Sequence, residues 1–152
     1  MPTTPARAPS GWTTALCACI LTLVPHLARG QGADSATVTT LSKVYAESQA
    51  VKGRQVYLTS CVSCHQQTEY AGEKFWGRLV GRPLGEFFNY LRTNMPQDNP
   101  ASLSDEDYVN VTAYILRLNV MPAGEQLLTA DSTALAKIRV ARADTTRKGS
   151  PR

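Results

Sequence analysis

The sequence predicts an all-α domain, and three observations lead to this prediction. Apolar residues recur at helical spacing in two stretches, residues 83–93 and 105–119. Both stretches are bounded by residues that start or stop helices. No alternation of apolar and polar residues is long enough to indicate a strand, and no internal repeat is visible.

The first expected helix covers about residues 47–60. Gly53 lies inside it, where glycine costs roughly 1 kcal/mol relative to alanine. A glycine at such a position often marks a close backbone crossing with another helix. Tyr57 follows one turn later on the same face and is expected to complete that contact.

The second expected helix runs from Pro83 to Thr93. Proline is favoured at the first helical position, because the N–H that it lacks would be unpaired there anyway. The helix must end before Met95-Pro96, since the residue before a proline avoids the helical region. Its apolar face consists of Leu84, Phe87, Phe88 and Leu91.

The third expected helix, about residues 105–119, has the clearest signals. Ser104 is a good N-cap, and three acidic residues follow it in the first turn, where the helix dipole favours negative charge. Asn119 ends the helix. The apolar stripe is formed by Tyr108, Val111, Ile115 and Leu118, and Val109, Ala113 and Leu116 widen it.

Residues 1–30 have the organisation of a secretory signal peptide. Arg7 provides a basic n-region, the run from Trp12 to Leu27 is mostly apolar, and the small residues Ala28 and Gly30 follow. The alternative is an uncleaved membrane anchor, for which the run is short and is interrupted by proline and histidine. We therefore expect an exported, periplasmic protein that contacts the membrane only if the signal is uncleaved.

The remaining chain divides into a flexible leader (31–44), one folded domain (45–124) and a partly disordered C-terminal extension (125–152). The formal net charge of +4 is spread along the chain. A nucleic-acid-binding protein usually has a concentrated basic face, so we expect no nucleic-acid partner.

The motif Cys61-Val62-Ser63-Cys64-His65 carries the chemistry. Without the signal, Cys61 and Cys64 are the remaining cysteines and His65 is the remaining histidine. Structural zinc needs four ligands, and three are present. A redox dithiol is expected at the start of a helix in a βαβ unit, and a plain disulfide leaves His65 unexplained. The pattern Cys-x-x-Cys-His is the attachment pattern of c-type haem, with both thiols bound to the macrocycle and the histidine on the iron.

Two methionines are candidates for the second axial ligand of that iron. Met95 lies in a loop between two helices and is followed by Pro96, which stiffens the loop. Met121 lies just after the last helix, where a hydrophobic plug is the better interpretation. We therefore expect Met95 to bind the iron opposite His65. A thioether ligand raises the reduction potential relative to a second histidine.

The sequence resembles the class I (mitochondrial-type) c-type cytochromes over about residues 47–120. The resemblance implies an all-α cytochrome c fold, with three main helices around one covalently bound haem. It also implies that the first and last helices cross near Gly53 and Tyr114. The matching residues are Gly53, Tyr57, the Cys-x-x-Cys-His motif, Met95-Pro96 and Tyr114.

A narrower resemblance connects residues 92–96, 102–106 and 113–119 with the cytochrome subunits of bacterial sulfite dehydrogenases and of some quinoprotein dehydrogenases. The basic C-terminal tail departs from the short ending that is usual there. The expected partners are redox proteins, namely a donor dehydrogenase and an acceptor cytochrome or oxidase.

These observations predict a periplasmic monohaem cytochrome that carries one electron and is not an enzyme. One alternative is a haem c subunit of a periplasmic oxidoreductase, such as a sulfite or quinoprotein dehydrogenase. Another is a five-coordinate haem enzyme or gas sensor, which requires an open distal side. Trp76, Arg78 and Arg82 are candidates for hydrogen bonds to the haem propionates.

Overall fold

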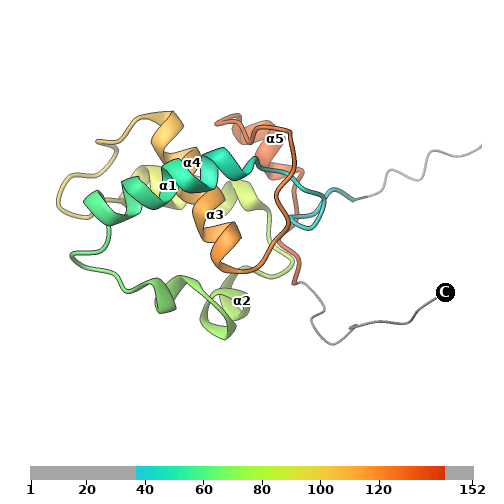
Figure 1. The fold of residues 1–152 in the computed structure, drawn as a ribbon, viewed down its shortest axis with the longest axis horizontal. Helices are drawn as coiled ribbons and strands as arrows, with labels where there is room; N and C mark the ends of the chain where they lie inside the picture. Colours follow the sequence, from blue (N-terminus) through green and yellow to red (C-terminus); the bar gives the residue numbers. More distant parts are fainter. Residues whose placement is uncertain (1–36, 143–152) are drawn as a thin grey trace, which may run out of the picture. The chain divides into compact units, whose positions relative to one another are not determined.

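The computed structural model describes residues 37–142, and this part of the chain is helical (Figure 1). The predicted signal peptide (1–30) and the basic end of the chain lie outside the described residues. No strand occurs within residues 37–142, where pairing is limited to isolated bridges, so the all-α prediction is confirmed. The elements are α1 (Glu47–Ser60), the 3-10 helix η1 (Gln67–Tyr70), α2 (Glu73–Leu79), α3 (Leu84–Asn94), α4 (Asp105–Leu118) and α5 (Ser132–Ala136).

Helices α1 and α4 cross in direct backbone contact, as the resemblance implied (Figure 1). A Cβ atom added to Gly53 would overlap the backbone carbonyl of Asn110, so only glycine fits at the crossing. One turn further along α1, the ring of Tyr57 packs on the ring of Tyr114 with their centroids 5.4 Å apart. Glycine destabilises the interior of α1 relative to alanine, but its lack of a side chain allows the two helices to approach closely.

Helix α4 has the N-cap and the buried apolar face that the sequence predicted. The Ser104 hydroxyl accepts a hydrogen bond from the Asp107 backbone N–H at 3.1 Å. This N-cap satisfies one of the free N–H groups of the first turn. The broad apolar face is buried along nearly the whole helix, from Tyr108 to Leu116. Helix α4 therefore packs against several elements and forms the centre of the domain.

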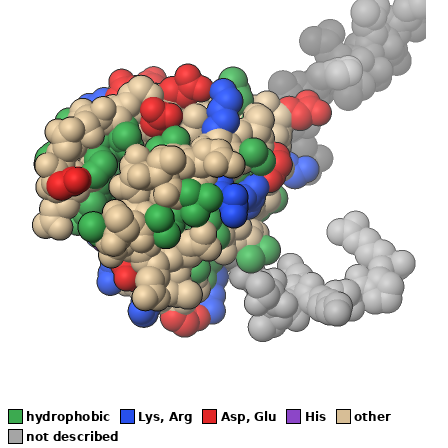
Figure 2. All heavy atoms as spheres, turned by 60° about the vertical axis from the view of Figure 1, so that its left-hand side comes forward, with side chains coloured by type: hydrophobic (Ala, Val, Ile, Leu, Met, Phe, Trp, Pro, Cys, Tyr) green, Lys and Arg blue, Asp and Glu red, His purple; other side chains and the backbone are tan. Residues whose placement is uncertain are grey.

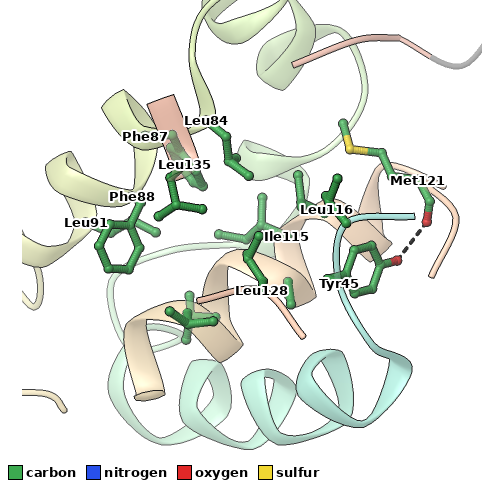
Figure 3. Close-up of a cluster of buried hydrophobic side chains, with 14 of the residues drawn as sticks. Tyr45, Leu84, Phe87, Phe88, Leu91, Ile115, Leu116, Met121, Leu128 and Leu135 are labelled. Atoms are coloured by element: carbon green, nitrogen blue, oxygen red, sulfur yellow. Dashed lines mark hydrogen bonds between the residues drawn. The ribbon is translucent and has the colours of Figure 1, made fainter. Parts of the chain in front are cut away.

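The hydrophobic core lies between α4 and α3 and extends to α5 (Figure 3). Helix α3 contributes the apolar face that its spacing predicted. Met121 lies in this core with 3% of its surface exposed, which confirms its interpretation as a plug. The core side chains labelled in Figure 3 include Leu84, Phe87, Phe88, Leu91, Ile115, Leu116, Leu128 and Leu135.

The segments at the two ends of the described chain pair with each other, and the C-terminal one also pairs with the segment that precedes α3. The backbone N–H of Thr40 donates to Arg139 O at 2.9 Å, and the N–H of Val140 donates to Arg82 O at 2.9 Å. Thr40 and Val140 are both buried. Residues assigned to the leader and to the extension thus contribute to the packed core. The domain boundaries themselves stay a prediction.

Helix η1 and helix α2 lie in the long connection between α1 and α3 (Figure 1). The buried ring of Phe75 anchors α2 by an edge-on contact with Phe87, at 6.1 Å between centroids. The buried amide of Asn119 donates to Tyr70 O at 2.7 Å and accepts from Gly72 N–H at 3.0 Å. The end of α4 thereby fixes the connection that follows the Cys-x-x-Cys-His motif. Within residues 37–142 no helix has the length and apolar character needed to span a membrane.

Candidate functional site

The Cys-x-x-Cys-His motif forms a tight turn directly after α1. The N–H of Cys61 donates to Tyr57 O at 3.0 Å, and the N–H of His65 donates to Cys61 O at 2.9 Å. Both cysteines carry free thiols; Cys64 is exposed and Cys61 is half-buried. Burial raises the pKa of the Cys61 thiol. The turn therefore presents two reduced thiols and an imidazole from consecutive positions.

A cavity of about 590 Å³ opens beside this turn. Its volume falls within the range that is usual for cofactor sites, roughly 300–1,000 Å³. Cys61, Cys64 and His65 line one side, and Met95 lines it from the loop after α3. The apolar side chains Leu91, Val111 and Ile115 also line it.

The cavity opens between the turn after α1 and the loop between α3 and α4. Both segments lie on the left in Figure 1, and Figure 2 turns this side forward. Uncharged and hydrophobic side chains predominate on the face shown there. The polar residues that line the cavity are mostly neutral, with Asp98 as the charged one among them; they are Thr59, Ser60, Ser63, Gln97, Asp98, Asn99 and Ser102.

A second cavity, of about 400 Å³, shares three lining residues with the first: His65, Tyr70 and Met95. Its remaining lining comes mainly from η1, α2 and α3 and includes the basic side chains Lys74, Arg78 and Arg82. Arg78 and Arg82, two of the residues predicted to contact the propionates, thus line a common cavity with His65 and Met95. Arg82 also donates to Glu86 Oε2 at 2.7 Å.

Trp76 is placed differently from the two arginines. It does not line the second cavity; its ring packs edge-on against Phe75, at 5.0 Å between centroids. This contact belongs to the core side of α2. The structure therefore does not bring Trp76 together with Arg78 and Arg82 in a common cavity wall, and the propionate contacts stay a prediction.

His65 is held on three sides. Its backbone carbonyl accepts a hydrogen bond from the Tyr57 hydroxyl at 2.9 Å, and the ring of Tyr70 lies edge-on to the imidazole at 5.3 Å between centroids. Nδ1 of the imidazole lies 3.1 Å from Glu69 Oε2. Metal-binding histidines commonly use one ring nitrogen for such a contact and the other for the metal. The arrangement leaves Nε2 of His65 available.

Met95 is held through its backbone. Its N–H donates to Leu91 O at 2.9 Å, which ends α3, and its carbonyl accepts from the Tyr108 hydroxyl at 2.6 Å. The side chain is half-buried and lines both cavities, as His65 does. The structure thus brings the two predicted axial ligands to the same cavity from distant parts of the chain.

Two phenols, those of Tyr57 and Tyr70, lie in the wall of the cavity. Burial, followed by the nearby Tyr70, raises the pKa of Tyr57 to about 12. Burial and the nearby Glu69 raise the pKa of Tyr70 to about 12. Both phenols therefore stay neutral at physiological pH. Together with Leu91, Val111 and Ile115, their rings give the cavity an apolar portion that suits a large hydrophobic cofactor.

The residues present fit a covalently attached haem. Two free thiols, an imidazole and a thioether line one cavity whose wall is partly apolar. Within residues 37–142 no group of three or more His, Cys, Asp and Glu side chains is arranged to bind a metal ion by itself. The donor set thus favours haem over the zinc alternative that the cysteine spacing alone had left open.

The helical fold and this donor set define a c-type cytochrome domain. Residues 48–115 match the family model described as "Cytochrome C oxidase, cbb3-type, subunit III", which is a family of class I c-type cytochromes. No curated protein and no solved structure matches the chain. The cofactor is covalent haem c, and the family implies haem-based electron transfer between redox partners. The narrower resemblance to dehydrogenase subunits stays a prediction.

Sequence reasoning missed three residues that support the site: Glu69, Tyr108 and Asn119. Tyr108 was assigned to the apolar stripe of its helix, which is where its ring lies, but the partner of its hydroxyl depends on the fold. Asn119 was interpreted as a helix end only. Glu69 had one available signal, because it follows His65 by four positions and metal-binding histidines often contact a carboxylate.

Proposed function

We propose that this chain is an exported, periplasmic monohaem cytochrome that carries one electron at a time. Cys61 and Cys64 form the thioether links, His65 is the proximal ligand and Met95 is the distal ligand. The observation that carries the proposal is the common cavity, which is lined by all four of these side chains. Cys61, Cys64 and His65 come from the turn after α1. Met95 comes from the loop that follows α3 in the sequence.

When bound, the haem supplies an iron that alternates between the ferric and ferrous states. The protein holds the ligands in fixed positions and limits the access of water. Tyr57 fixes the backbone of His65, and Leu91, Val111 and Ile115 supply an apolar part of the cavity wall. Fixed ligands allow the charge on the iron to change with little rearrangement of the chain.

The choice of Met95 over Met121 as the distal ligand rests on where the two side chains lie. Met95 lines both cavities, whereas Met121 is packed in the core beyond α4 and lines neither. The two methionines have the same chemistry, so their positions decide which of them is the candidate ligand. The His/Met pair also disfavours the five-coordinate enzyme or sensor, which would need an open distal side.

The periplasmic location rests on the signal-like pattern of residues 1–30. Redox partners follow from the family, and a free carrier between a donor dehydrogenase and an acceptor cytochrome or oxidase is the simplest arrangement. A subunit role in a sulfite or quinoprotein dehydrogenase is the second candidate, favoured by the similar segments at residues 92–96, 102–106 and 113–119. Co-purification with a molybdenum-containing or quinone-containing chain would favour the subunit role.

The ligand assignment is tested by Met95→Ala beside the matched variant Met121→Ala, both expressed with haem-maturation machinery. We expect Met95→Ala alone to lose the low-spin optical spectrum and to bind carbon monoxide readily in the reduced form. Met121→Ala removes the same group from the core, so it lowers stability and leaves the spectrum unchanged. Ready binding of carbon monoxide to the unaltered protein would contradict His/Met ligation and favour the sensor.

A further inference from the structure

The loop between α3 and α4 (residues 95–104) carries Met95, and one side chain fastens both ends of it. The hydroxyl of Tyr108, in the first turn of α4, donates to Met95 O at 2.6 Å. The same hydroxyl accepts a weaker hydrogen bond from Leu103 N–H at 3.4 Å. A single oxygen thus joins the start of the loop to its end.

We call these two hydrogen bonds of the Tyr108 hydroxyl the clamp. The clamp lies at the buried base of a loop that is otherwise exposed. Tyr108 is 2% exposed, whereas residues 97–102 all lie at the surface. Inside the loop, the structure shows a local backbone bond from Asn99 N–H to Pro96 O at 3.1 Å. Outside it, Arg92 and Asp105 form an ion pair at 3.4 Å that is exposed and therefore contributes little. The bond from the buried Tyr108 to Met95 O is shorter than either of these two contacts.

Resting on the proposed His/Met ligation, we propose that Tyr108 is a positioning residue that keeps Met95 at the distal side of the haem. The methionine leaves that side when the loop lifts from its base. Lifting breaks the bond between the hydroxyl and Met95 O, so the bond opposes ligand loss. Removing the hydroxyl leaves a carbonyl without its buried partner and favours the open loop.

The expected effect is modest and measurable. A net hydrogen bond of this kind changes an equilibrium by about fivefold to tenfold, which corresponds to about 1–1.4 kcal/mol. An added ligand such as imidazole competes with Met95 for the ferric iron. Its apparent affinity rises by the same factor as the open population, because a binding-competent minor state limits apparent affinity by its population.

The chain offers a matched control for this hydroxyl. Tyr45 is 1% exposed, and its hydroxyl donates to Met121 O at 2.7 Å (Figure 3). Tyr45→Phe therefore deletes the same bond type, from a buried tyrosine to a methionine carbonyl. Met121 lines neither cavity, so this loss acts on stability alone.

The experiment titrates the oxidised, haem-loaded protein with imidazole and follows the optical spectrum, with the melting temperature of each variant measured in parallel. We expect Tyr108→Phe to bind imidazole about fivefold to tenfold more tightly than the unaltered protein. The affinity of Tyr45→Phe for imidazole should stay within about twofold of that of the unaltered protein. Both variants should melt at a lower temperature than the unaltered protein. Equal affinities for the two variants, or no change in Tyr108→Phe, would overturn the role of Tyr108.

Met95→Ala separates this inference from the proposed function. A much tighter affinity for imidazole in Met95→Ala, together with no change in Tyr108→Phe, would overturn the clamp and leave the ligand assignment intact. An unchanged affinity in Met95→Ala would overturn the ligand assignment itself. A folded Tyr108→Phe variant is verified by its cooperative melt before its affinity is compared.

Discussion

Nδ1 of His65, which lines both cavities, and the carboxylate Oε2 of Glu69, which lines the second one, lie 3.1 Å apart. The imidazole N–H donates to the carboxylate, and this hydrogen bond, with a backbone hydrogen bond, lowers the pKa of Glu69. A carboxylate on the outer nitrogen of a metal-binding histidine fixes its tautomer and makes it a stronger electron donor. Glu69 is therefore expected to influence the redox properties of the bound haem.

The first prediction concerns the reduction potential. Glu69→Gln keeps the size of the side chain and removes its charge. A less basic His65 stabilises the ferric state less, so we expect the midpoint potential to rise. Potentiometric titration measures it directly. Glu73→Gln is the control, because Glu73 carries the same charge on α2 and pairs with Arg142. Equal shifts in both variants would show a general charge effect and contradict a role for the hydrogen bond.

The second prediction concerns the crossing of α1 and α4. Gly53→Ala would drive a Cβ into the backbone carbonyl of Asn110, and backbone cannot move aside as a flexible side chain can. We expect a loss of about 1–3 kcal/mol in the free energy of unfolding, or more if the helices separate. Denaturant titration of the haem-loaded protein measures this loss.

Gly77→Ala is the matched control for Gly53→Ala. Gly77 lies within α2, and a Cβ there would meet no atom within 4 Å. Alanine is favoured over glycine inside a helix by about 1 kcal/mol. This variant should therefore be as stable as the unaltered protein or more so. Similar destabilisation by both substitutions would mean that the backbone contact at Gly53 does not limit the fold.

The third prediction concerns alkaline pH. Burial, with a smaller contribution from the nearby Glu47, raises the pKa of Tyr45 from 10.0 to about 12. The folded state therefore keeps the phenol proton at a pH where the unfolded chain has released it. This contribution to stability is complete below pH 10 and is lost as the pH rises from about 10 to 12.

Comparing the unaltered protein with Tyr45→Phe isolates this titration, because the other groups titrate alike in both. The free energy of unfolding should fall more steeply between about pH 10 and 12 in the unaltered protein than in the variant. Parallel pH profiles would show that Tyr45 has an ordinary pKa in the folded state.

The features that follow local rules were predictable from the sequence. Helix α4 begins at Asp105 as predicted, because Ser104 and the acids after it act within one turn. Gly53 and the face of α3 were likewise recognised from spacing alone. Helices α2 and α5 were not predicted, since each is too short to show a clear period and depends on tertiary contacts such as that of Phe75.

The candidate site divides in the same way. Cys61, Cys64 and His65 are adjacent in the sequence, and Met95 followed from the shortage of other ligands. Glu69 and Tyr108 act through the directions of a carboxylate and a hydroxyl, which the folded chain decides. Sequence patterns place a residue on a face of a helix, and they do not indicate which distant atom its polar group reaches.

The central claim is that one haem is covalently attached at Cys61 and Cys64, and intact-mass spectrometry of the denatured mature protein tests it most directly. Denaturation removes any haem that is held only by ligands, so the mass records thioether bonds alone. After expression with haem-maturation machinery, the mass should exceed that of the mature polypeptide by one haem, and Cys61→Ala/Cys64→Ala should lose this increase. A mass equal to that of the polypeptide alone would contradict the account.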